Sequence, residues 1–411
     1  MKKMRIAEIN SCNFGSTGKI MLEIADVAAR YGHMAVVCYP KSRTNLKKQK
    51  EGDIAIGSRF FRNVHLKLAG ITGLNGCFSY FSTLHFLRRL DKFKPDILHL
   101  HNLHNSYINL PLLFRYIKKH DIRVVWTLHD CWSFTGHCPY FTMVKCGKWK
   151  TGCFRCPQYK GYPESIVDDS KFMYKRKKKW FTGVKNMTLV TPSEWLAGLV
   201  RQSFMKDYPV MVIHNGIDLS VFRPTPSDFR EKHGIPKEKT LLLGVAFGWG
   251  KRKGLDVFVS LHGRLDPEKY QIVLVGTDDA ADRELPEGIL SVHRTQNQTE
   301  LAEIYTAADL FVNPTREENY PTVNMESLAC GTPVLTFETG GSPEIPDETC
   351  GSVVECDDLD ALESEILRIG REKPFSAEAC LKRAQSFDMN EKYKEYVKLY
   401  EDRAHCAERT L

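Results

Sequence analysis

The sequence has no long hydrophobic run. No apolar stretch approaches the roughly 18 residues that a membrane span requires. The opening residues MKKMRIAEIN pass directly into a strand-like segment instead of forming a basic-then-apolar leader. Internal repeats and low-complexity segments are also lacking. These absences argue against an integral membrane protein, a secreted protein and a repeat protein, and we expect a protein of the cytoplasm.

The common nucleotide-binding loops are missing as well. The segment NFGSTGKI, Asn13–Ile20, follows an apolar run and contains glycines, hydroxyls and a lysine. An ATP-type loop needs four residues between its glycines and a Ser or Thr after the lysine. Here two residues separate Gly15 from Gly18, and Ile20 follows Lys19. The dinucleotide fingerprint is absent too, so what remains is a turn that presents backbone N–H groups at the start of a helix.

Negative charge is scarce in the first half of the chain. Residues 1–200 carry 33 Lys and Arg against 13 Asp and Glu, whereas residues 201–411 carry 25 against 37. A basic half indicates an anionic partner. The densest basic run is YKRKKKWF, Tyr174–Phe181. It is compatible with a nucleic-acid surface, with a surface for anionic lipid anchored by its aromatic residues, or with a solvated helix face.

Apolar runs typical of strands alternate with amphipathic stretches such as Ile20–Arg30 and Leu301–Ala308. Near-continuous apolar strands in such an alternation predict parallel sheets covered on both faces. Two series of strands therefore predict an α/β protein with two doubly wound domains. The first series is Met4–Ile9, Met34–Tyr39, Asp96–His101, Val124–Leu128, Met187–Thr191 and Val210–His214, and the second is Thr240–Phe247, Tyr270–Gly276, Ile289–His293, Asp309–Asn313, Pro333–Phe337 and Ser352–Glu355.

The joint between the domains is expected at Asn215–Phe229, where Asn-Gly and two prolines interrupt the periodicity. We expect an N-terminal domain over residues 1–214 and a C-terminal domain over residues 215–387. A final helix at about residues 388–411 is expected to pack back on the N-terminal domain. Because ligands of open α/β sheets bind beyond the carboxyl ends of the strands, a cleft between two such domains is the default active site.

The most informative segment for chemistry begins at EENYPTVNMES. Glu318 and Glu326 are separated by seven residues, and Pro321 suits the first position of a helix. The N–H groups of Thr322 and Val323 would then be available to a diphosphate at the helix start. The carboxylate of Glu326 can accept both hydroxyls of a ribose, while Glu318 can hydrogen-bond a sugar or stabilise positive charge near its anomeric carbon.

Together with the following SLACGTPVL, this pair of glutamates resembles the signature of the family 4 retaining glycosyltransferases. Further pieces occur in the family's order and extend the resemblance over nearly the whole chain. They are GSTGKI, DILHLHN, TLHD, TPSEWLA, NGIDLSVFRP, KRKGLDVF and YTAADLFVNPT.

The resemblance implies the GT-B fold, two Rossmann-like domains facing across a cleft. It also implies three catalytic residues: Glu318 beside the transferred sugar, Lys253 at the leaving diphosphate, and His129 of TLHD against the sugar from the N-terminal domain. The resemblance further implies that Glu326 binds the ribose of the nucleotide. The full donor-binding set that it implies is Gly15, Ser16, Arg252, Lys253, Asn319, Tyr320, Thr322, Val323 and Glu326.

The chain departs from the family pattern at two places. The arginine usual five residues before the lysine of the Lys-Gly pair is Gly248 here, so Lys251 or Arg252 would have to replace it. Asn319-Tyr320-Pro321 stands where the family has a glycine-rich stretch. No Asp-x-Asp motif points to a bound divalent cation, and no catalytic metal is expected. A lysine can instead stabilise the negative charge that develops on the leaving oxygen.

Two groups of metal-type ligands need separate interpretation. Cys138, Cys146, Cys153 and Cys156 have the spacing C-x7-C-x6-C-x2-C, and in a reducing compartment this spacing indicates a structural zinc ion, with free thiols or a disulfide as the alternatives. The pair His99/His101 alternates along a strand and fits either a metal site or strand residues that border the cleft. We favour the second interpretation.

These observations predict a retaining glycosyltransferase that moves a sugar from a nucleoside diphosphate to a saccharide or lipid-linked saccharide acceptor in surface polysaccharide biosynthesis. Peripheral contact with the inner face of the plasma membrane is an accompanying hypothesis, and no nucleic-acid partner is expected. Three alternatives stay open: a sugar-nucleotide epimerase of the same fold, a basic nucleic-acid-binding protein and a catalytically inactive, zinc-stabilised binding protein. The second would show strongly salt-dependent binding to generic nucleic acid.

Overall fold

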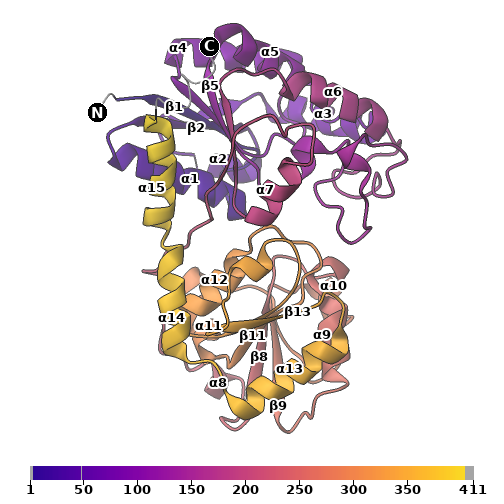
Figure 1. The fold of residues 1–411 in the computed structure, drawn as a ribbon, viewed down its shortest axis with the longest axis vertical. Helices are drawn as coiled ribbons and strands as arrows, with labels where there is room; N and C mark the ends of the chain where they lie inside the picture. The colour runs from indigo at the N-terminus through magenta and orange to yellow at the C-terminus, as the bar shows by residue number, and fades with distance from the viewer. Residues whose placement is uncertain (1–2, 48, 403–411) are drawn as a thin grey trace. The chain divides into compact units, whose positions relative to one another are not determined.

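The structure is a computed structural model that describes residues 3–47 and 49–402 (Figure 1). It divides into two compact units. One unit runs to His214 and takes up the chain again from Lys392, and the other is Asn215–Glu391. Each unit contains one sheet in which all strands are parallel, so the predicted α/β class with two doubly wound domains is confirmed. Among the described residues, no helix is long and apolar enough to cross a membrane.

The N-terminal unit has a seven-stranded sheet in the order β3-β2-β1-β4-β5-β6-β7. Its central strands are almost fully buried, as expected for a sheet covered on both faces. The strands are β1 (Arg5–Ile9), β2 (Met34–Pro40), β3 (Ile54–Ile56), β4 (Ile97–Leu100), β5 (Arg123–Thr127), β6 (Met187–Thr191) and β7 (Val210–Val212). The helices are α1 (Gly15–Arg30), α2 (Arg43–Lys47), α3 (Arg59–Thr72), α4 (Tyr80–Phe93), α5 (Leu110–His120), α6 (Ser170–Phe181), α7 (Glu194–Val200) and the short 3-10 turns η1 (Trp132–Phe134) and η2 (Lys148–Lys150).

The C-terminal unit has a six-stranded sheet in the order β10-β9-β8-β11-β12-β13. Its strands are β8 (Thr240–Val245), β9 (Tyr270–Val275), β10 (Leu290–Val292), β11 (Leu310–Asn313), β12 (Val334–Phe337) and β13 (Gly351–Val354). The helices are α8 (Phe229–Lys232), α9 (Leu255–His262), α10 (Asp279–Asp282), α11 (Gln298–Ala307), α12 (Thr322–Ala329), α13 (Leu359–Glu372) and α14 (Ala377–Ala384). The 3-10 turns are η3 (Lys251–Lys253), η4 (Ser342–Glu344) and η5 (Gln385–Phe387).

Both strand orders reverse direction beside the first strand of the unit. In the N-terminal unit β1 lies between β2 and β4, and in the C-terminal unit β8 lies between β9 and β11. At such a point the loops that follow the two neighbouring strands diverge and leave room for a ligand at the carboxyl edge of the sheet. The loops at these two edges contain the residues on which the chemistry was predicted to depend.

The last described helix, α15 (Met389–Glu401), contributes tyrosines to the N-terminal unit. The hydroxyl of Tyr400 lies 2.7 Å from Nδ1 of His99, and that of Tyr396 lies 3.1 Å from Oγ1 of Thr127. The guanidinium of Arg123 donates to the carbonyls at the end of the helix. Of the predicted terminal helix, residues 403–411 lie outside the described residues.

The basic run Tyr174–Phe181 does not form the aromatic surface that we considered. It lies in α6, where Tyr174, Trp180 and Phe181 are buried in the core. Lys177 is fully buried, and its ammonium donates to the carbonyl of Trp132 at 2.7 Å. Within this run, only Lys175, Arg176, Lys178 and Lys179 are exposed. Of the three interpretations left open for this run, aromatic lipid anchors are excluded, because the aromatic residues follow the helical spacing of a core stripe.

Candidate functional site

Lys253 and Glu318 form an ion pair in the C-terminal unit, although 65 residues separate them in the chain. Lys253 ends η3, which follows β8, and Glu318 lies between β11 and α12. The two residues therefore occupy the loops at the reversal point of the sheet. Both side chains are largely withdrawn from solvent, at 18% and 17% exposure. The contact brings together two of the residues that the sequence assigned to catalysis.

Glu318 is held as a carboxylate. Burial raises the pKa of Glu318, but the ammonium of Lys253 and the guanidinium of Arg252 together lower it by more than burial raises it. The pKa of Glu318 therefore lies below its ordinary value. Its second carboxylate oxygen accepts the N–H of Asn319 at 3.2 Å. Arg252 also donates to the carbonyl of Glu317 at 3.3 Å. Of the two candidates to replace the missing arginine at Gly248, Arg252 is thus the one whose charge acts on Glu318.

Backbone contacts fix η3 against the loop that carries Glu318. The carbonyl of Arg252 accepts the N–H of Arg316 at 2.9 Å and the hydroxyl of Thr315 at 3.3 Å. Gly254 follows η3 with a φ of +77°, and a Cβ there would lie 2.4 Å from the carbonyl oxygen of Pro314. Only glycine permits this approach. The Lys-Gly pair therefore positions Lys253 by allowing close backbone contact.

Helix α12 begins at Thr322, and Pro321 occupies the N-cap position with extended backbone. The predicted helical start at Pro321 is wrong by one residue. The first N–H groups of the helix, which include Thr322 and Val323, have no intrahelical acceptor by helix geometry. Buried Asn324 accepts from the amide of Asn313 at 2.7 Å and donates to the hydroxyl of Ser342 at 2.9 Å. This network ties α12 to β11 and η4.

The remaining predicted donor residues are distributed around α12. Glu326 lies on the helix and accepts the hydroxyl of Tyr305 at 3.3 Å. Asn319 is buried beside Glu318, and its carbonyl accepts the N–H of Gly341 at 2.7 Å. Tyr320 is 4% exposed and packs in the core of the unit. Its phenol ring therefore faces the protein interior.

In the N-terminal unit, the segment NFGSTGKI ends the loop after β1 and forms the first turns of α1. Gly15 opens α1 with a φ of +68° and no atom within 4 Å of a Cβ placed on it, and both Gly15 and Ser16 are exposed. The amide of Asn10 donates to the carbonyl of Thr17 at 3.1 Å. Lys19 forms an ion pair with Glu23 at 3.4 Å on the same helix. Gly15 and Ser16 are thus the accessible part of the turn.

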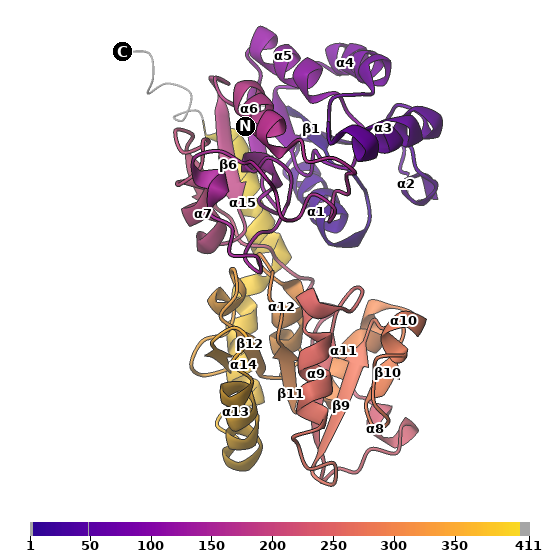
Figure 2. The ribbon, with the colours of Figure 1, turned by 90° about the vertical axis from the view of Figure 1, so that its right-hand side faces the viewer.

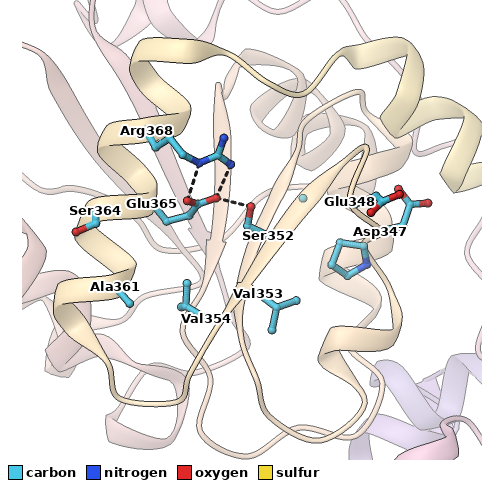
Figure 3. Close-up of a pocket in the computed structure, with 11 residues that line it drawn as sticks. Asp347, Glu348, Ser352, Val353, Val354, Ala361, Ser364, Glu365 and Arg368 are labelled. Atoms are coloured by element: carbon cyan, nitrogen blue, oxygen red, sulfur yellow. Dashed lines mark hydrogen bonds and ion pairs between the residues drawn. The ribbon is translucent and has the colours of Figure 1, made fainter.

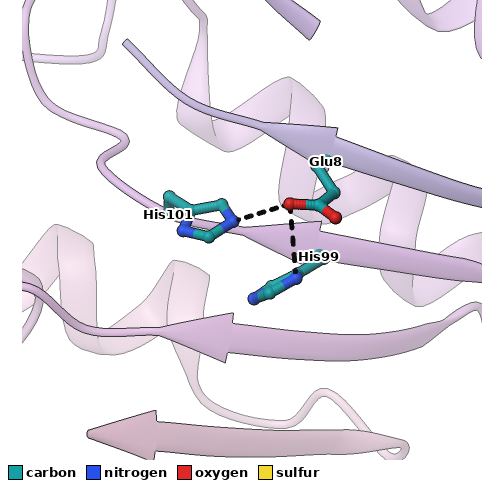
Figure 4. Close-up of side chains that lie close together, drawn as sticks. All are labelled: Glu8, His99 and His101. Carbon is teal, nitrogen blue, oxygen red and sulfur yellow. Dashed lines mark hydrogen bonds and ion pairs between the residues drawn. The ribbon is translucent and has the colours of Figure 1, made fainter. Parts of the chain in front are cut away.

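His129 follows β5 and is connected to a buried polar chain. Its Nε2 lies 3.0 Å from Nδ1 of His101, and Nε2 of His101 lies 3.2 Å from a carboxylate oxygen of Glu8 (Figure 4). Burial lowers the pKa of His129 to about 4, with the neighbouring carboxylate of Asp130 opposing this effect. At neutral pH, His129 is therefore an uncharged imidazole that can donate or accept a hydrogen bond.

The donor atoms of Glu8, His99 and His101 lie within 4.8 Å of one another, which is a spacing that could hold a metal ion. Hydrogen-bond partners lie beside both ring nitrogens of His99, however: the hydroxyl of Tyr400 at 2.7 Å and that of Thr127 at 2.8 Å. His101 has Glu8 and His129 as partners. The geometry accordingly fits a hydrogen-bonded network of neutral imidazoles at the carboxyl end of β4.

These buried histidines predict acid lability. Burial lowers the pKa of His65 and His99 to about 3 and that of His129 to about 4, and it also lowers the pKa of His101. Between the ordinary histidine pKa and these values, only the unfolded chain binds the protons, so the free energy of unfolding falls as the pH falls. We expect a loss of about 1.4 kcal/mol per pH unit for each histidine below about pH 6.5.

Burial raises the pKa of Glu8, so as the pH falls the folded chain binds a proton at this carboxyl before the unfolded chain does. This uptake offsets the effect of one histidine on the free energy of unfolding. Urea unfolding between pH 7.5 and 4.5, read by tryptophan fluorescence, measures the slope. His65→Phe should reduce the slope of the unfolding free energy against pH by the contribution of one histidine, about 1.4 kcal/mol per pH unit. A free energy of unfolding that stays constant over this pH range would contradict neutral buried histidines.

The four clustered cysteines lie in one segment of the N-terminal unit. The N–H of Gly136 donates to Sγ of Cys153 at 3.1 Å, and a hydrogen bond from the thiol of Cys138 lowers the pKa of Cys156 to about 7. In the described part of the chain, the only groups of three or more possible metal ligands within 4.8 Å are Glu8/His99/His101 and the exposed Asp279/Asp282/His293. The four cysteines, including Cys146, therefore do not form a closed tetrahedral set in this structure.

A hollow of about 680 Å³ in the C-terminal unit lies between β13 and α13 (Figure 3). At its wall the carboxylate of Glu365 binds the guanidinium of Arg368 at 2.7 Å and the hydroxyl of Ser352. None of the predicted site residues lines it. Because the carboxylate of Glu365 already has partners, we do not assign chemistry to this hollow.

Sequence reasoning missed Glu8 and the role of His101 as the neighbour of His129. A glutamate within a buried central strand is rare, because burial of an unpaired carboxylate is costly. That signal was present in the strand Met4–Ile9.

The sequence matches two family models and several known proteins. A model described as "Glycosyltransferase Family 4" matches residues 17–221, and one described as "Glycosyl transferases group 1" matches residues 238–372. A protein of Escherichia coli (strain K12) named as a colanic acid biosynthesis glycosyl transferase, WcaC, is 26% identical over 300 residues, which are 69% of each chain. Glycogen synthase of Bacillus cereus (strain Q1) is 27% identical over 310 residues, covering 64% of this chain and 62% of the synthase.

Solved structures share the fold over nearly the full length. Sucrose-phosphate synthase from Thermosynechococcus elongatus superposes with a TM-score of 0.71 at 18% identity, covering 97% of this chain and 98% of the synthase. Anabaena Alr3699/HepE in complex with UDP-glucose gives a TM-score of 0.67 at 14% identity, covering 97% and 99%. At these identities the likeness establishes the fold.

Proposed function

Because the chain belongs to the GT-B glycosyltransferases of the group 1 and family 4 type, we propose that it transfers a sugar from a nucleoside diphosphate to a saccharide or lipid-linked saccharide, with retention of anomeric configuration. The observation that carries the proposal is the Lys253–Glu318 ion pair at the reversal point of the C-terminal sheet. It places a cation and a carboxylate together beside a helix start that suits a diphosphate.

In the proposed reaction, the bond between the anomeric carbon and the diphosphate oxygen breaks, and its electron pair stays on the leaving oxygen. The ammonium of Lys253 stabilises that negative charge, assisted by the N–H groups at the start of α12. The carboxylate of Glu318 stabilises positive charge on the sugar ring. The acceptor hydroxyl then bonds to the same face of the anomeric carbon and passes its proton to the leaving diphosphate oxygen, and no protein nucleophile takes part.

We assign Glu326 to the ribose hydroxyls, and Gly15 with Ser16 to the donor phosphate or sugar. His129 would hydrogen-bond a sugar hydroxyl in its neutral form, which its lowered pKa supports. The acceptor half of the proposal, a saccharide or lipid-linked saccharide of a surface polysaccharide, draws support from the similarity to WcaC. A lipid-linked acceptor would require peripheral contact with a membrane.

A panel of UDP-, GDP- and ADP-sugars tests the proposal, with binding read by calorimetry and turnover read by nucleotide release with and without acceptor extracts. The UDP-sugars are the first choice because HepE, a structural neighbour, was solved with UDP-glucose. Absence of both binding and turnover for every donor would reject the enzyme. Interconversion of two sugar nucleotides without acceptor would instead identify the epimerase alternative, and the anomeric configuration of the product tests retention.

We also propose that Cys138, Cys146, Cys153 and Cys156 bind a structural zinc ion. Their spacing and the contact between the thiols of Cys138 and Cys156 support the proposal, although the sulfur atoms would have to draw together to reach tetrahedral geometry. Elemental analysis of protein purified without chelator should give about one zinc per chain. Cys153→Ser should lose it, whereas Cys77→Ser, outside the cluster, should not. Less than about a tenth of an equivalent in the wild type would contradict the site.

A further inference from the structure

Helix α3 turns its apolar face toward solvent. Phe60, Val64, Leu68 and Ile71 recur at helical spacing and form one stripe, and all four are exposed, Phe60 at 69% and Ile71 at 55%. The side of α3 that packs on the unit buries only His65 and Ala69. By contrast, α5 buries four apolar residues against the sheet. An amphipathic helix whose apolar stripe faces water requires a partner for that stripe.

Neighbouring segments extend this apolar surface. Nδ1 of His65 lies 2.8 Å from the hydroxyl of Ser79, so the start of α4 lies against the middle of α3 (Figure 2). Phe81, in the first turn of α4, is 75% exposed. On another side, the N–H of Ile166 donates to the carbonyl of Gly70 at 2.7 Å, and the Ile166 side chain is 71% exposed. We call α3, the first turn of α4 and residues 166–167 the α3 surface.

Basic residues predominate along α3 and α4 in the α3 surface. Between Asp53 and Asp91 the chain contains no Asp or Glu, whereas it contains five basic residues: Arg59, Arg62, Lys67, Arg88 and Arg89. Arg59 and Lys67 are exposed on α3 itself. Glu164 and Asp168 are exposed carboxylates on the adjoining loop. Exposed aromatic and aliphatic side chains flanked by cations match the interface of a bilayer that contains anionic lipid, with the apolar groups among the acyl chains and the cations at the headgroups.

We propose that the α3 surface docks the protein on an anionic lipid bilayer. A second copy of the chain is a poorer occupant, because symmetric pairing of this surface would bring its cations against one another. The proposal rests on the proposed function in one respect: a lipid-linked acceptor has to be met at a bilayer. It replaces the basic run of α6, whose aromatic residues are buried, as the lipid-binding surface.

Vesicle flotation tests the α3 surface with the full chain. The probes are vesicles of phosphatidylcholine alone and vesicles with about 30% phosphatidylglycerol, whose surface is negatively charged. We expect the wild type to float with the anionic vesicles only, and less so at high salt. Phe60→Ser with Phe81→Ser should lower the partition coefficient by about tenfold or more. Arg59→Gln with Lys67→Gln should lower it by a similar factor, since each cation near an anionic surface contributes several-fold.

Phe247→Ser is the matched control, because Phe247 is 94% exposed and lies in the C-terminal unit. It should bind vesicles as the wild type does. All substituted side chains are exposed, and unchanged circular dichroism and melting temperature would show that the variants fold. The proposal is overturned if the wild type ignores anionic vesicles, or if Phe60→Ser with Phe81→Ser binds them as well as wild type. A wild-type dimer that these changes dissociate would assign the surface to a second copy instead.

Donor binding by calorimetry on the same preparations separates the two proposals. Protein that binds a nucleotide sugar but no vesicle contradicts the α3 surface alone. Protein that binds anionic vesicles but no nucleotide sugar contradicts the proposed function and leaves the lipid-binding surface standing.

Discussion

Replacing Lys253 with alanine should lower kcat/KM for sugar transfer by about 100-fold or more, because the variant loses the cation at the leaving oxygen. It should also disturb Glu318, whose pKa is held down by Lys253 against the opposing effect of burial. Without the ammonium, burial would raise the pKa of that carboxyl. Activity of Lys253→Ala should therefore decline further toward acid pH than that of the wild type. Steady-state nucleotide release with donor and acceptor, measured across pH, provides both readouts.

Lys251→Ala is the matched control for this experiment. Lys251 begins the same 3-10 turn, and its backbone carbonyl, not its side chain, accepts from Arg316. Its removal should leave transfer near the wild-type rate. Glu318→Gln should lower transfer about as much as Lys253→Ala, and the double variant should be little worse than either, since paired residues act as a unit. Wild-type rates in both single variants would remove Lys253 and Glu318 from the mechanism.

Gly340→Ala should destabilise the C-terminal unit strongly, and more than Gly234→Ala does. Gly340 has a φ of +59°, and a Cβ placed on it would lie 1.8 Å from the carbonyl oxygen of Glu318. The loop must shift to relieve this overlap, at an expected cost of about 3 kcal/mol or more of unfolding free energy. Because the displaced carbonyl belongs to Glu318, transfer should fall as well. Urea unfolding and steady-state kinetics measure the two effects.

Gly234→Ala separates steric overlap from backbone strain. Gly234 lies in the same unit with a φ of +63°, but no atom lies within 4 Å of its added Cβ. This variant bears the left-handed strain alone, about 1 kcal/mol, and should transfer sugar normally. Equal destabilisation by the two substitutions would show that the contact between Gly340 and Glu318 is unimportant.

The strands of both sheets could be predicted from the sequence because buried parallel strands are continuous apolar runs. The exception is β3, Ile54–Ile56, which is three residues long and bounded by Asp53 and Gly57. β7 and β10 are as short, but their apolar runs extend beyond the strands in the sequence, whereas Asp53 and Gly57 close the run at β3 on both sides. Its place at the sheet edge depends on pairing with β2, which is a tertiary property.

Glu318 and Lys253 were named through the resemblance of their segments to family motifs, and their catalytic roles stay predictions. Their direct contact was not predictable, since it depends on the strand order that places β8 beside β11. The lysine-rich composition of α6 left three interpretations open, although its spacing already separated core residues from solvated ones. Trp180 and Phe181 follow Tyr174 and Lys177 at helical intervals, and this stripe is buried in the core.

The contribution of α15 to the N-terminal unit has a consequence for synthesis. The ribosome completes β1 to β7 long before it makes Tyr396 and Tyr400, so the nascent unit must wait for about 180 further residues. During that interval His99 and Thr127 lack the hydroxyl partners that they have in the finished chain. The C-terminal unit, continuous in sequence, can fold as soon as its own last strand and helices emerge. The N-terminal unit, although it is synthesised first, is thus the second of the two units to reach its final structure.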